Sequence, residues 1–438
     1  MADWVGPLLS LLVFFLGGLA LGIPMGFVMG VGGVVTGLIF SGPALMHLAL
    51  ASTWGVMQSQ SLLAAPMFIF MAIILEKSGI ADALFDALHQ WLGPLRGGLS
   101  AGVILICAVL GAMSGIAAAG TVTMGLIALP IMLQKNYSKS MAIGPILVGG
   151  PMGILIPPSV GFIIYGMLTS TSIGSLFAAG LIPGIILAVF YVIYILIRCH
   201  IKKDEGPAIP KEERVSLREK FRLLKALILP LLIVFAVLGS IFAGIASPTE
   251  SAAVGALGAT LSAVIYRKFY WKMLYQAAIR TFSIMGMIVW ILFGAKVFSA
   301  VLISTGIPNM LKIFVQTLDV APLFIVFLMI CSYFILGCFL EETTMLFITI
   351  PIYMPILSAL GYDPLWFGVL FIIGMQMAYI TPPFGFSLFF MKGIAPPGVT
   401  TKDIYKSVPP YIIIQFATVI LCMFFPQIVM WLPNLLYH

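Results

Sequence analysis

Long apolar runs recur along this chain, for example at 182–197 and 227–245. Several approach the ~20 residues that a helix needs to cross a hydrocarbon core of ~30 Å. Backbone groups in that core must satisfy their own hydrogen bonds, which leaves helices or closed barrels. Because the runs are continuous and do not alternate over ten-residue segments, they indicate helices. The pattern predicts an all-α polytopic membrane protein.

A single strongly polar stretch, 198–225, divides the chain into a first half, 1–197, and a second half, 226–438. Each half has room for five crossings and a hydrophobic hairpin that enters and leaves on one side. We expect crossings near 7–22, 25–41, 61–76, 141–168, 173–197, 226–245, 250–266, 283–304, 365–391 and 408–432, and hairpins near 99–133 and 321–356.

The basic residues orient these crossings. With 198–225 taken as a cytoplasmic linker, 20 of the 22 Lys and Arg residues fall on the cytoplasmic side, while Lys312 lies outside and Lys296 lies within a span. This distribution obeys the positive-inside rule, so both termini are expected outside. The same rule explains the net charge of +7 better than nucleic-acid binding does.

Composition agrees with a membrane location. Only 8% of the residues are charged, against about 25% in soluble domains. The five cysteines contain no C-x-x-C pair and lie in or beside apolar segments, so they are interpreted as structural thiols. Two amphipathic stretches, 81–92 and 266–280, are expected to lie along the cytoplasmic interface.

The two halves resemble each other in order. The matching features are Ser78-Gly-Ile with Thr305-Gly-Ile, Leu110-Gly with Leu336-Gly, Pro130 with Pro351, and Ile156-Pro-Pro with Ile380-Thr-Pro-Pro. Because five crossings is an odd number, such repeats would have opposite orientations in the membrane. Two inverted halves, each with an interrupted span, are typical of transporters. Chance similarity between apolar segments is the alternative.

Adjacent prolines are expected to interrupt one span in each half. Proline lacks an N–H and clashes with an earlier carbonyl, so Pro157-Pro158 and Pro382-Pro383 cannot continue a helix. Freed carbonyls near the midplane can hold a hard cation, and the half-helix that follows presents its positive end to an anion. A simple packing kink is the alternative.

The hairpin turns are polar for their predicted depth. Residues 111–125 are small and include the hydroxyls of Ser114, Thr121 and Thr123, and such backbone is tolerated at depth only in protein or beside water. The second turn carries Glu341 and Glu342. Acids in an apolar hairpin suggest a cation or proton site, although an acid before Thr343 also suits a helix start.

Other ionisable groups give weaker signals. Lys296 and Glu250 could form an intramembrane charge pair, while Glu250 in Ser-Pro-Thr-Glu-Ser could instead cap a helix. There is no H-E-x-x-H motif, and no G-x-S-x-G lies in a strand–turn–helix context. The sequence therefore predicts a transporter and not an intramembrane enzyme.

Five motifs together carry a family resemblance over essentially the whole length. They are Gly111-Ala-Met-Ser-Gly115, Gly149-Gly-Pro-Met-Gly-Ile-Leu-Ile-Pro-Pro-Ser159, Ala246-Ser-Pro-Thr-Glu-Ser-Ala-Ala253, Glu341-Glu-Thr-Thr344 and Ile380-Thr-Pro-Pro-Phe-Gly-Phe386. The chain resembles the large membrane (M) subunit, DctM-like, of tripartite ATP-independent periplasmic (TRAP) transporters. The resemblance implies an elevator-type importer of organic acids in the bacterial inner membrane, driven by a sodium gradient.

The resemblance also implies partners: a periplasmic substrate-binding (P) protein and a small membrane (Q) subunit, expected as a separate chain because this sequence starts at the large subunit's first span. C4-dicarboxylates, sialic acids and other small acids all stay open as substrates. A stand-alone sodium–dicarboxylate symporter of related fold is the nearest alternative, and a channel would need no coupling.

At least two sodium sites are implied where hairpin tips meet the interrupted spans. The first would involve Ser114, Gly115, Gly153, Pro157 and Pro158. The second would involve Glu342, Thr343, Thr381, Pro382 and Pro383. Because no arginine lies in any predicted span, the substrate carboxylate is expected to meet helix dipoles and hydroxyls, namely those of Ser114, Thr121, Ser159 and Thr344.

Overall fold

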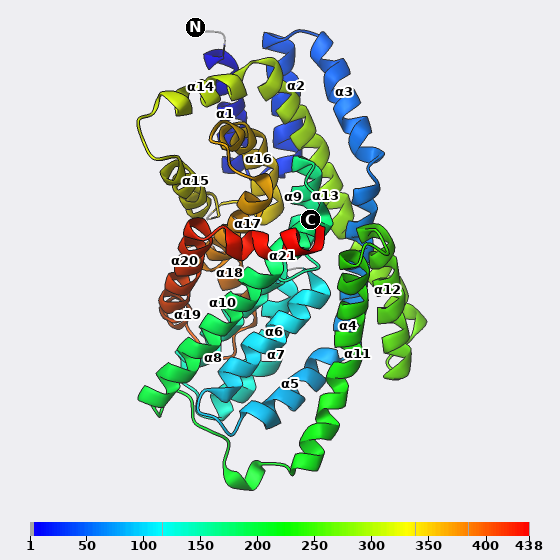
Figure 1. Cartoon of the computed structure of the whole chain (residues 1–438), viewed down its shortest axis with the longest axis vertical. Helices are drawn as coiled ribbons and strands as arrows, with labels where there is room; N and C mark the ends of the chain where they lie inside the picture. The colour runs from blue at the N-terminus through cyan, green and yellow to red at the C-terminus, as the bar shows by residue number, and fades with distance from the viewer. Residues whose placement is uncertain (1–3, 116, 338, 384, 438) are drawn as a thin grey trace.

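The computed structural model describes residues 4–115, 117–337, 339–383 and 385–437. The side chains outside this description also include those of Ser114, Ala118, Lys211, Ala226 and Leu227. Every regular element in the described residues is helical, which confirms the predicted all-α class (Figure 1). Among the described residues, five helices are long and apolar enough to cross a membrane by themselves, and a bent pair within α11 would make six.

The chain begins with helices that pack through small residues. These are α1 (Val5–Ala20), α2 (Met25–Phe40), α3 (Ala44–Met57), the short η1 (Gln60–Leu63) and α4 (Ala64–Lys77). Glycines of α2 let α13 (Trp271–Ser304) approach closely: a Cβ built on Gly294 would lie 2.3 Å from the carbonyl oxygen of Gly26. Such a contact admits only glycine.

A hairpin and a broken span follow. Helix α5 (Ile80–Leu92) leads into the hairpin of α6 (Gly98–Ser114) and α7 (Ala117–Gln134). The predicted span 141–168 is a sequence of α8 (Lys139–Gly149), η2 (Gly150–Ile154) and α9 (Val160–Thr169). The long helix α10 (Ile173–Ile201) then reaches the linker, which contains η3 (Lys211–Glu213).

The second half has a similar order of elements. Helices α11 (Leu217–Phe242), α12 (Pro248–Ile265) and α13 precede α14 (Ile307–Thr317). A second hairpin consists of α15 (Pro322–Leu336) and α16 (Glu342–Ala359), and a second broken span consists of α17 (Pro364–Ile380) and α18 (Phe386–Ile394). The chain continues through α19 (Thr401–Ser407), α20 (Pro409–Phe424) and α21 (Gln427–Tyr437).

The hairpins and broken spans of the two halves interlock. Helix α18 packs against α7 of the first hairpin, while α9 packs against α16 of the second (Figure 1). A Cβ on Gly125 of the first hairpin would meet the side chain of Ile394 in α18 at 2.2 Å. The two broken spans also touch each other, since a Cβ on Gly161 of α9 would lie 3.0 Å from Ile372 of α17. Each broken span is therefore held by the hairpin of the other half as well as by its own.

The structure corrects several predicted boundaries. The amphipathic stretch 266–280 is not a separate interfacial helix, because α13 runs without a break from Trp271 to Ser304. Helices α3 and α14 were not predicted, and the single span expected at 408–432 is two helices, α20 and α21. The amphipathic stretch 81–92 is a helix, α5, and its place at the cytoplasmic interface stays a prediction.

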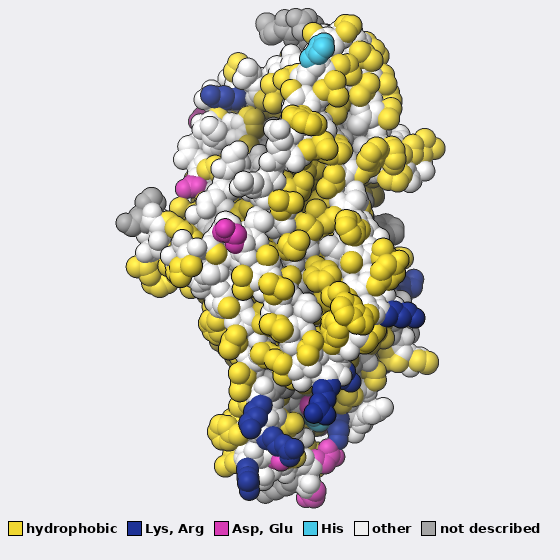
Figure 2. Space-filling view, turned by 90° about the vertical axis from the view of Figure 1, so that its right-hand side faces the viewer, with side chains coloured by type: hydrophobic (Ala, Val, Ile, Leu, Met, Phe, Trp, Pro, Cys, Tyr) yellow, Lys and Arg dark blue, Asp and Glu magenta, His cyan; other side chains and the backbone are white. Residues whose placement is uncertain are grey.

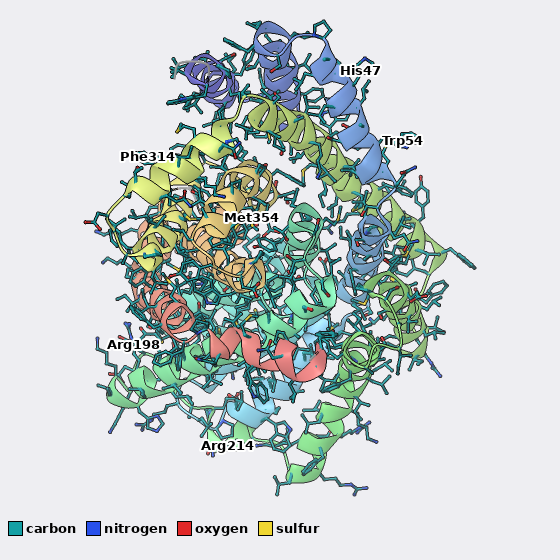
Figure 3. The ribbon with its side chains drawn as sticks, turned by 45° about the horizontal axis from the view of Figure 1, so that its top comes forward. His47, Trp54, Arg198, Arg214, Phe314 and Met354 are labelled. Atoms are coloured by element: carbon teal, nitrogen blue, oxygen red, sulfur yellow. The ribbon has the colours of Figure 1, made fainter. Side chains whose placement is uncertain are left out.

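Charged side chains gather at one end of the molecule. On the face shown in Figure 2, most Lys and Arg side chains lie in the lower part, below a broad apolar band. Figure 3 places Arg198 and Arg214 at this end and His47 at the opposite end. The linker is fastened here by backbone hydrogen bonds from Gly97 to Gly206, from Ser138 to Glu205 and from Ile209 to Gly93.

Candidate functional site

The first broken span leaves α-helical geometry between Gly150 and Ser159. The 3-10 helix η2 begins at Gly150 and has Pro151 in its first turn, and Pro157-Pro158, joined by a cis peptide bond, separate η2 from α9. Ser159 then starts α9 as its N-cap: its hydroxyl accepts from the Phe162 amide and donates to the Ile154 carbonyl at 2.6 Å. The Ser159 side chain is buried, and its hydroxyl makes both of these hydrogen bonds. It therefore holds the start of α9 to the end of η2 across the interruption.

The tip of the first hairpin lies directly against this break through glycines. A Cβ on Gly111 would lie 2.5 Å from the Cα of Gly153, and one on Gly120 would lie 2.9 Å from the Cα of Gly150. At the end of α6, Gly115 has φ +61°, and a Cβ there would lie 2.8 Å from the carbonyl oxygen of Pro158. The predicted site residues Gly115, Gly153, Pro157 and Pro158 are thus brought together.

Thr121, on the second arm of this hairpin, belongs to the same contact. Its side chain is fully buried beside Gly150, where a Cβ would lie 1.9 Å from the Thr121 Oγ1. That hydroxyl has no hydrogen-bond partner among the described residues. Buried polar atoms normally have a partner, so Thr121 is available to a ligand at this point. The predicted Ser114 ends α6, but its side chain lies outside the described residues.

The second broken span is interrupted at Thr381. This residue ends α17, and its hydroxyl donates to the Met377 carbonyl at 2.6 Å. Pro382 and Pro383 are again joined by a cis bond, and Phe384, which follows, lies outside the described residues. Gly385 closes the turn by donating to the Thr381 carbonyl, and α18 begins at the next residue.

The second hairpin brings a buried acid to this break. Glu342 begins α16, is 9% exposed, and its carboxylate accepts a hydrogen bond of 3.1 Å from the hydroxyl of Tyr379. Thr343 donates to the carboxylate of Glu341 at 3.3 Å. Glu341 occupies the N-cap position of α16 without a side-chain capping bond. Neither acid therefore caps α16 through a hydrogen bond from its side chain to a backbone amide.

A cavity of about 1080 Å³ adjoins the second hairpin. Glu341 and Thr344 line it from the hairpin, and it also touches the turn between α1 and α2, the middle of α13, and α18. Most of its other walls are apolar, including Trp290 and Phe386. Of the predicted substrate residues, Thr344 lines this cavity, whereas Thr121 and Ser159 lie at the first break.

The predicted charge pair is not present. Glu250 forms a capping box with Ser247, whose amide and hydroxyl both donate to its carboxylate at 2.7 Å. In the described part of the chain no ion pair joins Glu250 to Lys296, which is half-buried in α13. The capping alternative is therefore the correct one, because Ser-x-x-Glu satisfies the free amides at the start of α12 locally.

The arrangement combines three chemical features at two places. Each interruption frees backbone carbonyls that a hard cation accepts as ligands, and each is followed by the N-terminus of a half-helix, α9 or α18. The second interruption adds the carboxylate of Glu342. Gly111 and Tyr379 were not predicted as site residues. Gly111 could have been found, because it begins the Gly111-Ala-Met-Ser-Gly115 motif.

Comparison with known proteins decides the family. A family model described as "Tripartite ATP-independent periplasmic transporter, DctM component" matches residues 12–428, nearly the whole chain. The chain belongs to the DctM family. A DctM component is a multi-pass membrane transport subunit and not an enzyme, as the resemblance predicted. This family works together with a small permease subunit and a periplasmic binding protein.

Relatives of this DctM chain are named for several substrates. It is 31% identical to "C4-dicarboxylate TRAP transporter large permease protein DctM" of Pseudomonas aeruginosa, over 93% of each chain. It is 31% identical to "Ectoine/5-hydroxyectoine TRAP transporter large permease protein UehC" of Ruegeria pomeroyi, over 86% of this chain and 87% of the relative. It is 29% identical to "Sialic acid TRAP transporter large permease protein SiaM" of Vibrio cholerae, over 96% and 97%.

Two further matches are a longer permease protein and a solved structure. The isethionate TRAP transporter permease protein DctMQ of Oleidesulfovibrio alaskensis is 25% identical over 98% of this chain, which covers 67% of that protein. The crystal structure of the Alcanivorax borkumensis YdaH transporter superposes with a TM-score of 0.67, covering 97% of this DctM chain and 99% of that chain. Its 14% identity supports the fold alone.

Proposed function

We propose that this large permease imports a small organic solute across the bacterial inner membrane by coupling its movement to sodium ions. At least two sodium sites would lie at the two hairpin–break contacts, one at Gly115, Gly153 and Pro157, the other at Glu342 and Thr381. Both chain termini would face the periplasm. A periplasmic binding protein would deliver the solute, and a small Q subunit, as a separate chain, would support the permease.

The observation that carries this proposal is the duplicated contact between a hairpin tip and an unwound proline pair. One contact is made by backbone against backbone, at Gly111 and Gly153, and the other adds the buried carboxylate of Glu342. Glu342 has no positively charged partner within the described residues. A buried carboxylate is costly unless a cation or a proton accompanies it, so Glu342 suits a site that takes up one of these, and we propose that the ion is sodium.

The interlocking of the two halves supports an elevator movement. Because α7 packs on α18 and α9 on α16, the two hairpins and the two broken spans would move as one body. The inverted-repeat assignment, with 1–197 and 226–438 as its halves, would place the two contacts on either side of one substrate position. Packed interfaces between helices switch between discrete arrangements and do not deform continuously. Alternating access requires such a switch.

The substrate would be a small organic acid, such as a C4-dicarboxylate or sialic acid; the relatives' names also include ectoine. Thr344 and Glu341 line the large cavity beside the second hairpin. No basic side chain lines this cavity in the described residues, so a carboxylate would bind through hydroxyls and helix N-termini, with help from the bound cations.

Uptake into proteoliposomes tests the proposal. The permease would be reconstituted with its small subunit, and labelled succinate, sialic acid and ectoine would be supplied with and without the binding protein, under an inward sodium or choline gradient. Uptake that requires both sodium and the binding protein supports the proposal. Sodium-driven uptake without the binding protein would establish the stand-alone symporter instead. Flux that ignores the sodium gradient would refute the coupled mechanism.

A further inference from the structure

Glu341 and Glu342 are adjacent in the second hairpin but have different surroundings. Glu342 is buried, and its carboxylate accepts the hydrogen bond from Tyr379. Glu341 instead lines the cavity of about 1080 Å³ beside the hairpin tip, and Glu342 does not. Among the described residues the carboxylate of Glu341 has Thr343 as its hydrogen-bond donor and forms no ion pair. Glu341 is therefore open to a positively charged group in the cavity.

The walls of this cavity carry no positive charge that would receive a purely anionic solute. Glu341 is the one ionisable side chain among the described residues that line it. A dicarboxylate inside would bring two further negative charges beside Glu341, with no lysine, arginine or histidine on the described walls to offset them. Like charges repel strongly in a site of low dielectric constant. The walls therefore disfavour a dianion.

Aromatic rings face the same cavity from four parts of the chain. They are Phe27 of α2, Trp290 of α13, Phe339 of the turn between α15 and α16, and Phe386 and Phe389 of α18. The rings of Phe27 and Trp290 pack against each other with their centroids 5.0 Å apart, yet about half of the Trp290 side chain stays uncovered by protein. The face of an aromatic ring is negative and attracts a cation, most strongly for tryptophan. Rings and carboxylate together favour a positively charged group.

The cavity also offers a place for one carboxylate. Glu341 is the N-cap residue of α16, and Phe386 is the first residue of α18, so two half-helices begin at its walls. The amides at the start of a helix carry a partial positive charge and suit an anion. A solute with one negative and one positive group would therefore be matched at both ends.

The kind of positive group follows from the scarcity of acceptors. Apart from Glu341, the side chains on the described walls are apolar, with the single hydroxyl of Thr344. A primary ammonium is strongly hydrated and would lose its hydrogen bonds to water here, whereas a quaternary or delocalised cation is weakly hydrated and suits ring faces.

We propose that the solute of this permease is a zwitterion that bears a quaternary or delocalised positive charge in addition to its carboxylate. The positive group lies between the carboxylate of Glu341 and the ring of Trp290, and the carboxylate lies at the start of α18. Glu341 is then a specificity-determining residue, whereas Glu342 serves the cation site. This inference rests on the proposed import function, because it takes the cavity as the place of the solute. A sodium ion shared by both acids is the alternative, since it would neutralise Glu341 and admit a dicarboxylate.

Two probes of equal shape test the charge directly. In tert-butylacetate a carbon atom replaces the quaternary nitrogen of glycine betaine, so only the positive charge is lost. Each would be added to the purified permease–small-subunit complex without the binding protein, and its affinity taken from the rise in melting temperature with concentration. Glycine betaine should bind about tenfold more tightly than tert-butylacetate, and ectoine more tightly than succinate. An apolar cavity without a cation site would prefer tert-butylacetate, which is the more hydrophobic of the pair.

Variants then assign the preference to its residues. Glu341→Gln keeps the size of the side chain and should remove most of the preference for glycine betaine, while Asp319→Asn, in the exposed loop between α14 and α15, should leave it unchanged. Trp290→Leu should weaken the preference, and Trp290→Phe, which restores a ring, should recover part of it. Melting of each variant without a probe shows whether it is folded, and the comparison of probes on the wild type needs no variant.

Three outcomes would overturn the inference. The first is equal or tighter binding of tert-butylacetate by the wild type. The second is a preference for glycine betaine that Glu341→Gln leaves intact. The third is that Glu341→Gln weakens all four probes alike and raises the sodium concentration needed for binding, which would assign Glu341 to the sodium site and leave the proposed function standing. Conversely, a preference for zwitterions that is the same with and without sodium supports the inference even if uptake proves independent of sodium.

Discussion

The contact between Gly111 and Gly153 offers a sharp test of how the first hairpin is seated. Replacing Gly111 by alanine would place a methyl carbon 2.5 Å from the Cα and 2.8 Å from the nitrogen of Gly153. These are backbone atoms of η2, so no side chain can rotate away, and the hairpin must shift from the break. Gly102 provides a matched control on the same helix, because its Cβ would meet only Leu88 and Leu92 at 3.7 Å.

The magnitude follows from two opposing effects. Alanine is favoured over glycine within a helix by about 1 kcal/mol, and this applies to both positions of α6. Overpacking at Gly111 costs about 1–3 kcal/mol, while at Gly102 the new contacts are ordinary. Gly102→Ala should therefore leave stability unchanged or raise it, and Gly111→Ala should be up to about 2 kcal/mol less stable than the wild type.

The functional consequence depends on the cation site. If sodium binds between this hairpin and the break, a strain of one to two kcal/mol in the bound state weakens the apparent sodium affinity by about 5–30-fold. Uptake measured against sodium concentration, with both variants at equal protein content, gives this value directly. The reasoning fails if Gly111→Ala and Gly102→Ala have the same sodium dependence and the same melting temperature.

Three other substitutions address separate contacts. Tyr379→Phe removes the hydroxyl that donates a hydrogen bond to Glu342. Such a bond contributes about 1.5–3 kcal/mol when the acceptor is charged, so sodium-driven uptake should fall about tenfold or more. Unchanged sodium dependence would contradict this expectation. The Arg198 guanidinium, which donates to the carboxylate of Glu205, lowers the pKa of Glu205 below its ordinary value. Its stabilisation is thus present above the ordinary glutamate pKa and is lost as the pH falls through the lowered value, and wild-type melting should approach that of Glu205→Gln below about pH 4. Lys296→Met should not alter the effect of Glu250→Gln on melting, because the two side chains form no pair; a coupling above about 0.5 kcal/mol in the double variant would show that they do.

The sequence predicted most of the long or strongly apolar elements. Hydropathy averages over a window, so it finds α10 and both broken spans, where apolar residues are dense. It missed α3, which mixes His47 and other polar residues into a short apolar helix, and α14, whose apolar side is balanced by a polar one. It also separated 266–280 from α13, because a change in polarity along a helix does not end the helix.

The candidate site was predictable to the extent that local chemistry determines it. Proline pairs interrupt a helix wherever they occur, and the Ser247 to Glu250 spacing is a capping box that could have been preferred on local grounds alone. The hydrogen bond between Tyr379 and Glu342 joins residues 37 positions apart, so it depends on how the second hairpin is seated. No periodicity in the sequence contains that information.

The linker's attachment has a mechanical consequence. Residues 205–209 are bonded to the base of the first hairpin at Gly93, Gly97 and Ser138, and the Trp91 indole donates to the Lys220 carbonyl within the first turn of α11. Hydrogen bonds thus hold residues 205–209 of the linker against the first hairpin. They also hold the N-terminal turn of α11 against α5. If the first hairpin moves as proposed, we therefore expect residues 205–209 to travel with its base, so that the start of the linker belongs to the moving body.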